Sequence, residues 1–228
     1  MSFYNNMRQL VLRHGAINNT YLSRFAKGHV SDIELNSFAV EFFQFSRNFP
    51  AILATLLVNT GDETEAAELT KVLTSELGDG DPKKRHELLF RKFLRSVGID
   101  PVKAMWKPML PTTKAFVEGM EKLYSSRNHF LALGASLGLE NMAISMWDQL
   151  IPGLNILKKK SFPSMDLEYF TFHRELEEQH EDAMETALSL YEKDPSIQRS
   201  FRSGASKVLD VLEGFWMGLE ARRSQKLR

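Results

Sequence analysis

The sequence predicts an all-α protein, folded as one compact bundle of about seven to eight helices. Apolar residues recur at helical spacing almost throughout the chain, and no segment shows the apolar–polar alternation of a half-buried strand. The helical segments are separated by short breaks that contain proline, glycine or capping residues. No internal repeat or low-complexity linker divides the chain, so residues 1–228 are expected to form a single helical domain.

The first half of the chain is expected to contain four helices in five segments, because the second helix restarts at Pro50. Ser31 and Asp62 are predicted N-caps, because their side-chain oxygens can accept hydrogen bonds from unpaired N–H groups of the first turn. Pro50 and Pro82 are each expected to begin a helix, since proline is tolerated at the first helical position. Gly98 is expected to end the last of the five. In chain order the segments are 4–27, 31–48, 50–59, 63–77 and 82–97.

A looser stretch containing three prolines is expected next, at positions 101, 108 and 111. The second half then continues with helices at 112–125, 128–158, 165–193 and 195–223. Whether Gly138 or Pro152 interrupts the second of these stays open, because both residues disfavour a helix interior. Pro163 and Pro195 introduce the last two helices.

The composition excludes several classes of function. Lys plus Arg and Asp plus Glu both total 29, so no net charge attracts nucleic acid or an anionic membrane, and neither is an expected partner. No apolar run is long enough to span a bilayer, and the N-terminus does not resemble a secretory signal, so a cytoplasmic protein is expected. The chain contains no cysteine, which excludes disulfides, thiolate metal sites and cysteine nucleophiles. Any metal must therefore bind to nitrogen and oxygen ligands, which suit iron, manganese or zinc.

The most informative motif is the segment HRELEEQH, which begins at His173 and ends at His180. At about 100° per residue, Glu177 and His180 lie within about 40° of His173 on one face of the predicted helix. The apolar residues Tyr169 and Phe170 share that face. A carboxylate there needs a compensating partner, because an unpaired buried charge is costly. A helix that merely carries many charges explains its outward acids but not these three inward residues, so metal binding is the favoured interpretation.

Three further residues occupy similar positions on other predicted helices. Glu140 lies in the middle of an apolar stripe, although an acid there could also pair with a buried cation. Glu76 and His86 lie on apolar faces of consecutive helices, and the Gly-Asp-Gly-Asp-Pro turn between them is expected to bring them together. Each alone is weak evidence, since a single histidine on an apolar face is usually just hydrogen-bonded. Three carboxylates and three histidines from four helices suit two metal ions bridged by a carboxylate.

The order of these residues resembles the heme-oxygenase-like di-metal oxidases and oxygenases. It runs Glu-x9-His, then a Glu 54 residues later, then His-x3-(Asp/Glu)-x2-His. The segment SELGDGDPKKRHELLFRKFLRSVGI is also similar to the first metal-binding helix pair of that family, whose relatives include TenA, PqqC and the chlamydial death-domain-associating protein. The likeness extends over about residues 35–195. By position it implies six metal ligands: Glu76, His86, Glu140, His173, Glu177 and His180.

The resemblance also implies a fold, a chemistry and a set of partners. The fold would be heme-oxygenase-like and the chain a homodimer. The cofactor would be Fe(II), two ions per chain, with manganese as the other candidate. The activity would be an O2-dependent oxidation or oxygenation of a small organic molecule, amino-acid-like or fatty-acid-like. One position departs from the family, which usually has Asp where this chain has Glu177. The extra methylene moves the carboxylate by about 1 Å and weakens the expectation for the second metal.

Other interpretations remain open at this stage. The chain could be a metal-free helical protein of the TenA or PqqC kind, although the TenA-type cysteine nucleophile is absent. It could also be a non-catalytic interaction module with a relic site. A heme oxygenase would need one proximal histidine and would leave the buried acids unexplained. His14, His29 and His129 are expected to have surface or capping roles, with His129 a candidate to support Glu140 if their helix is unbroken.

Overall fold

The computed structural model describes residues 2–176 and 194–225. These residues form helices joined by turns and loops, with no strand among them. The helices are α1 (Phe3–Arg13), α2 (Thr20–Ala26), α3 (Asp32–Asn59), α4 (Glu63–Glu76), α5 (His86–Ser96), α6 (Pro101–Trp106), α7 (Pro111–Tyr124), α8 (His129–Lys160) and α10 (Pro195–Gln225). Residues 168–176 are also helical. The predicted all-α fold class is confirmed.

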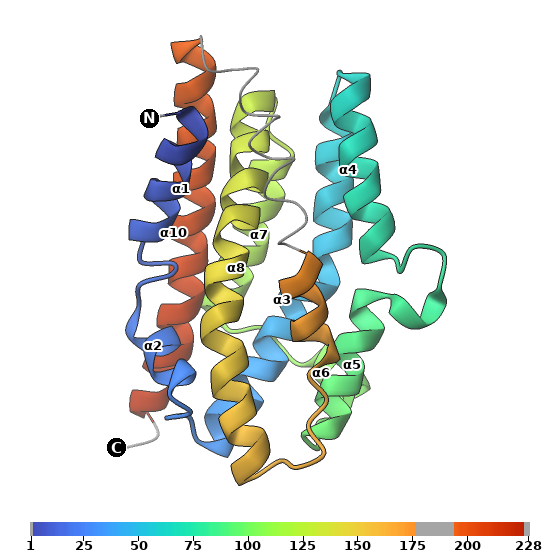
Figure 1. Ribbon diagram of the computed structural model, residues 1–228, viewed down its shortest axis with the longest axis vertical. Helices are drawn as coiled ribbons and strands as arrows, with labels where there is room; N and C mark the ends of the chain where they lie inside the picture. The colour runs from blue at the N-terminus through green and yellow to red at the C-terminus, as the bar shows by residue number, and fades with distance from the viewer. Residues whose placement is uncertain (1, 177–193, 226–228) are drawn as a thin grey trace.

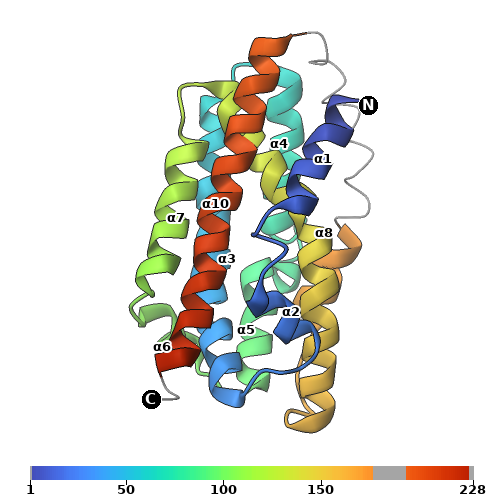
Figure 2. The ribbon, with the colours of Figure 1, turned by 90° about the vertical axis from the view of Figure 1, so that its left-hand side faces the viewer.

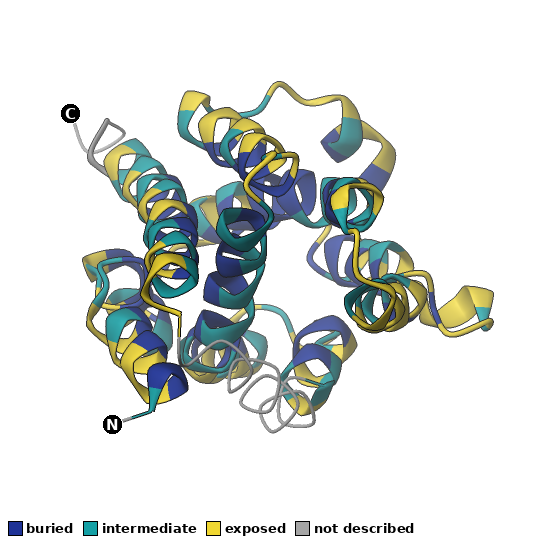
Figure 3. Cartoon of the chain, turned by 90° about the horizontal axis from the view of Figure 1, so that it is seen from above, coloured by how far each residue is buried: buried dark blue, intermediate teal, exposed yellow. Residues whose placement is uncertain are grey.

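The long helices α3, α7, α8 and α10 run along the long axis of the molecule (Figure 1). The most extensive packing is that of α10 against α8 and α7, and α1 and α2 cover the outer side of α8 and α10 (Figure 2). On the other side, α4 and α5 pack against α3. Seen from above, the helices turn their buried faces inward and their exposed faces to solvent (Figure 3). Among the described residues, none of the helices has the length and apolar character of a membrane-spanning segment.

Aromatic side chains from four helices form the centre of the core. Phe42 of α3 lies 5.8 Å from Phe90 of α5 and 5.9 Å from Trp147 of α8, measured between ring centroids. It also lies 6.5 Å from Trp216 of α10. Contacts at these separations contribute beyond the burial of apolar area. They fix α3, α5, α8 and α10 relative to one another around the site described below.

The α8–α10 interface depends on small residues. A methyl group at Gly204 would overlap the carbonyl oxygen of Leu131, and one at Gly134 would overlap the carbonyl oxygen of Phe201. The two backbones therefore approach more closely than any larger side chain would permit.

Two predictions for the first half of the chain were wrong. The segment 4–27 is two helices, because Asn19 caps a new one by accepting a hydrogen bond from the backbone N–H of Leu22 at 2.8 Å. The predicted restart at Pro50 does not occur, since α3 continues through that residue. Buried residues on both sides, Phe45 and Ile52, hold the helix in register. Their packing outweighs the hydrogen bond that proline removes.

Four further details differ from or complete the sequence expectations. Pro82 opens a short 3-10 turn, Pro82–Lys84, and α5 begins only at His86. The proline-rich stretch contains the short helix α6, whose N-cap Asp100 was not recognised. Helix α8 is unbroken through Gly138 and Pro152. The predicted helix 165–193 is helical from 168 as far as 176, and its remainder lies outside the described residues.

Candidate metal centre

Three of the six predicted ligand residues converge in the interior. Glu76 is the last residue of α4, His86 is the first of α5, and His173 lies in the helical segment 168–176. One ligand atom from each lies within 4.8 Å of the other two. Two ligands about 2.1 Å from a shared ion are at most about 4.2 Å apart, so small side-chain adjustments would close this cluster on one ion.

The turn between α4 and α5 brings Glu76 and His86 together. Its first residue after the helix cap, Gly78, has a φ of +95°, a conformation that side chains other than glycine rarely adopt. The N–H of Gly78 donates to the carbonyl of Ser75 at 2.8 Å, and that of Asp79 donates to Thr74 at 3.0 Å. The chain therefore reverses directly after Glu76, as the Gly-Asp-Gly-Asp-Pro motif predicted.

His86 is buried, with 3% of its surface exposed, and its ring nitrogens form no hydrogen bond with the described residues. Nδ1 lies 2.9 Å from Oε2 of Glu76, but the contact does not have hydrogen-bond geometry. Nε2 has no hydrogen-bond partner within the described part of the chain. Buried polar atoms are almost always paired, and each exception calls for an explanation. A cation shared by these ligand atoms would account for this one.

His173 is oriented as a ligand by its own helix. Its Nδ1 lies 2.6 Å from the backbone carbonyl of Tyr169, so Nδ1–H donates there and the lone pair is on Nε2. Burial, and next the neighbouring His86, lower the pKa of His173 from 6.5 to about 4, although Glu76 acts in the opposite direction. The imidazole is therefore neutral at physiological pH and free to bind a metal. Its ring lies 4.4 Å from that of His86, between centroids.

Glu140 lies outside this three-residue cluster but lines the same cavity of about 60 Å³ as Glu76 and His173. The cavity walls are mainly apolar and contain no lysine or arginine among the described residues. Its apolar walls comprise Phe42, Phe45, Phe49, Val72, Leu139, Met142, Ala143, Met146, Trp147, Tyr169 and Leu176. The remaining two predicted ligands, Glu177 and His180, lie outside the described residues.

The other three histidines are elsewhere. His14 is the C-cap of α1, and its Nε2 lies 3.2 Å from Oδ1 of Asp210. His129 begins α8 and contacts the carboxylate of Glu65 on α4. His29 is exposed.

Two roles of residues beside the cluster were not identified from the sequence. The Tyr169 carbonyl orients His173, and its position four residues earlier on a helix was the available signal. Phe172 lies 5.2 Å from the His86 ring, between centroids, and helps to enclose it. No sequence signal separates Phe172 from an ordinary core residue.

The helical bundle has a counterpart among known protein families. The sequence profile of one family, described as iron-containing redox enzyme, matches residues 36–213. The chain belongs to that family. None of the curated proteins matches it.

Several solved structures share the fold at low sequence identity. A CADD-like protein of unknown function from Nostoc punctiforme is 16% identical, with a TM-score of 0.81 and 96% of each chain covered. A TenA homologue from Pseudomonas syringae pv. tomato is 12% identical, with a TM-score of 0.78 over 96% of this chain and 91% of that one. A domain of unknown function with a heme oxygenase-like fold from Shewanella denitrificans is 15% identical, with a TM-score of 0.76 over 97% and 90%. These likenesses confirm the predicted heme-oxygenase-like fold.

Proposed function

We propose that this protein is an O2-activating oxidase or oxygenase with a non-heme di-iron centre. Its cofactor would be two Fe(II) ions, with manganese as the alternative metal. Its substrates would be O2 and a small organic metabolite, amino-acid-like or fatty-acid-like. We expect a cytoplasmic homodimer, with no nucleic acid or membrane as partner. Family membership supports iron and redox chemistry.

The observation that carries the proposal is the buried cluster of Glu76, His86 and His173. Its ligand atoms gather within 4.8 Å, and both ring nitrogens of His86 lack hydrogen bonds in the described part of the chain. Imidazole and carboxylate donors without thiolate suit iron or manganese. The residues present therefore fit a bound metal, whereas a purely structural cluster would be expected to satisfy its own polar atoms.

The described residues have clear roles in such a centre. Glu76 and His86 come from two helices joined by a tight turn, which keeps their separation short. His173 is held in the ligand tautomer by the Tyr169 carbonyl. The aromatic and aliphatic cavity walls exclude bulk water from the centre. When bound, ferrous ions supply the electrons that reduction of O2 requires.

A second metal requires more ligands than these three. Glu140 lines the same cavity and is our candidate for a shared carboxylate. Glu177 and His180 complete the proposed set on the basis of family resemblance. Because Glu177 replaces the usual aspartate, we expect the second ion to bind less tightly than the first.

The alternative is a metal-free protein of the TenA or PqqC kind, or a non-catalytic module. The fold shared with a TenA homologue is consistent with it. A protein of this kind would neither bind stoichiometric iron nor consume O2 when iron is added.

Anaerobic loading with ferrous iron separates these possibilities. We expect two iron equivalents per chain and, on exposure to air, O2 uptake with oxidation to the ferric state. His86→Ala should remove most of the iron and the uptake, while His29→Ala, the same change at an exposed histidine, should leave both intact. Iron that stays ferrous in air, or equal iron in the two variants, would contradict the proposal. A single equivalent would contradict its di-metal part.

A further inference from the structure

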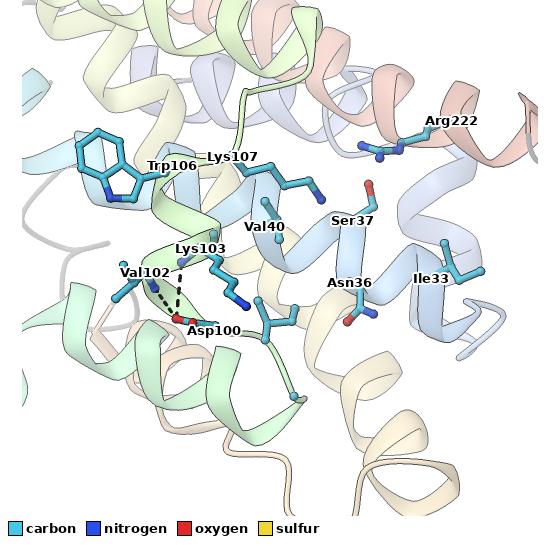
Figure 4. Close-up of a pocket in the computed structure, with 13 residues that line it drawn as sticks. Ile33, Asn36, Ser37, Val40, Asp100, Val102, Lys103, Trp106, Lys107 and Arg222 are labelled. Atoms are coloured by element: carbon cyan, nitrogen blue, oxygen red, sulfur yellow. Dashed lines mark hydrogen bonds between the residues drawn. The ribbon is translucent and has the colours of Figure 1, made fainter.

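Two adjoining hollows lie against the N-terminal half of α3. The larger, about 720 Å³, lies between α3, the 98–107 segment and the end of α10 (Figure 4). The smaller, about 290 Å³, lies between α2, α3 and α10. Both are lined by Ile33, Ser37 and Arg222. At about 100° per residue, Ile33 and Ser37 lie on the face of α3 opposite Phe42 and Phe49, which line the metal cavity. The hollows are therefore separate from the candidate metal centre.

Positive charge dominates the larger hollow. Its walls contain Lys103, Lys107 and Arg222 but one acid, Asp100. Oδ1 of Asp100 is occupied as the N-cap of α6, because it accepts the N–H of Val102 at 2.9 Å. Neither lysine forms an ion pair with the residues that the structure describes. Unpaired cations around a hollow favour an anionic ligand.

Lys107 and Arg222 extend from opposite sides toward the space beside the Ser37 hydroxyl (Figure 4). Arg222 has one acidic neighbour among the described side chains, Glu41, at 4.0 Å. The Glu41 carboxylate also accepts the N–H of Leu110 at 3.0 Å, so it does not depend on Arg222 alone. The guanidinium can therefore offer its remaining N–H groups to a ligand, and its planar shape suits a carboxylate or phosphate.

Two buried hydroxyls add hydrogen-bond donors. Ser37 Oγ and the Tyr21 hydroxyl are both buried and have no hydrogen-bond partner among the described residues. Tyr21 is 2% exposed, stacks on Trp216 at 5.6 Å between centroids, and lines the smaller hollow. Burial, with Glu34 adding to it, raises the pKa of Tyr21, so its hydroxyl is protonated at neutral pH. Buried hydroxyls without partners beside a hollow are explained by a ligand oxygen that accepts from them.

The acid of the smaller hollow is already engaged. Glu34 accepts from Arg24 Nη2 at 2.7 Å and from the Ser31 N–H at 2.9 Å. Apolar side chains complete the surroundings, since Ile33 is 57% exposed and Val40 and Ile99 line the larger hollow. An apolar ligand body would cover this surface.

We propose that the joined hollows bind a small organic acid, whose oxyanion accepts hydrogen bonds from Arg222, Tyr21 and Ser37. Lys107 adds positive charge at the mouth of the site. The apolar body of the ligand packs against Ile33 and Val40. Carboxylates and phosphate monoesters share this chemistry, and the test distinguishes them.

Calorimetric titration of the full-length protein with four probes tests the charge and the body separately. Hexanoate and hexyl phosphate carry both, hexanol has the body without the charge, and acetate has the charge without the body. We expect at least one six-carbon anion to bind more than about tenfold tighter than hexanol and acetate. The tighter anion identifies the head group. Equal affinities for the anion and hexanol, or no binding of either anion, would overturn the proposal.

Variants locate the site. Arg222→Gln should weaken binding of the anion by more than about tenfold, and Tyr21→Phe should weaken it by about fivefold. The Tyr21 change should leave the melting temperature unchanged, because its hydroxyl has no partner to lose among the described residues. It therefore remains decisive if Arg222→Gln, which also removes a neighbour of Glu41, folds poorly. Lys71→Gln makes the same charge change on exposed α4 and should have no effect.

His86→Ala separates this site from the metal centre. It should leave the affinity for the anion unchanged, because the metal cavity lies on the other face of α3. Binding that survives Tyr21→Phe at full strength, or that disappears in His86→Ala, would place the ligand elsewhere and overturn the proposal.

Discussion

The α8–α10 interface and the cluster of Glu76, His86 and His173 both lie in the interior, yet their atoms are satisfied in different ways. At the interface, Gly134 and Gly204 let two backbones pack without space for one methyl group. At the cluster, ring nitrogens of His86 are enclosed without a hydrogen bond from the described residues. Dense packing of this kind stabilises a fold. Buried ring nitrogens without hydrogen bonds do not stabilise it.

The α8–α10 interface holds the bundle together, whereas we propose that the cluster of Glu76, His86 and His173 binds metal. A change at the interface should affect stability and leave metal binding per folded molecule intact. A change at the cluster should do the reverse. The predictions below test this separation, from the largest expected effect to the smallest.

Gly204→Ala should destabilise the protein by about 3 kcal/mol, because the added methyl group meets the Leu131 backbone and cannot be accommodated by a side-chain shift. Gly214→Ala is the matched control on the same helix, since nothing lies within 4 Å of its added methyl group. It should stabilise by about 0.5–1 kcal/mol through helix propensity. Urea unfolding measures both. If the two variants changed the free energy of unfolding equally, close packing at Gly204 would not stabilise the fold.

The metal-free protein should lose up to about 3 kcal/mol of stability as the pH falls from about 6.5 to about 4. The pKa of His173 is lower in the folded state, so the unfolded chain binds more protons in this window and protonation favours unfolding. Above pH 6.5 and below pH 4 this contribution is constant. Urea unfolding of wild type and His173→Gln across this range isolates the effect, and an unchanged pH dependence in the variant would contradict the assignment.

His173→Ala should lower iron affinity by about 100-fold, equivalent to about 2.7 kcal/mol, while the helical content stays that of wild type. The variant removes one imidazole ligand from a cluster whose remaining carboxylate can protonate. Competition with a chelator measures the affinity, and circular dichroism measures the fold. If the variant bound iron normally but unfolded at a lower temperature than wild type, His173 would be a core residue and not a ligand.

Glu177→Asp should have the smallest effect, a gain in occupancy of the second iron with the first unchanged. The shorter side chain matches the residue that the resembling family usually has at this position. Iron stoichiometry under anaerobic titration measures the gain. No gain would mean that the longer side chain does not limit the second site.

Local sequence signals predicted most of the helices, and three of the six residues predicted as metal ligands converge in the structure. Glu76 and His86 are ten residues apart across a turn whose glycines specify its shape, so their proximity could be inferred from the chain alone. The break after α1 was missed because apolar periodicity continues across it, although Asn19 was a usable capping signal.

Contacts between distant segments could not be predicted in this way. Tyr21, Ser37 and Arg222 line one hollow only because α2, α3 and the end of α10 pack together. The sequence shows the residue types, but it does not show which buried hydroxyls remain without partners. The same holds for Glu140, whose place beside Glu76 and His173 depends on how α8 packs against its neighbours.

The most direct test of the central claim is anomalous diffraction at the iron edge, on crystals grown from protein loaded anaerobically with Fe(II). We predict an anomalous peak about 2.0–2.2 Å from the carboxylate of Glu76, a ring nitrogen of His86 and Nε2 of His173. A second peak beside Glu140 would establish the di-iron form. An iron-loaded crystal with no peak among these three residues, or with iron bound only elsewhere, would contradict the account.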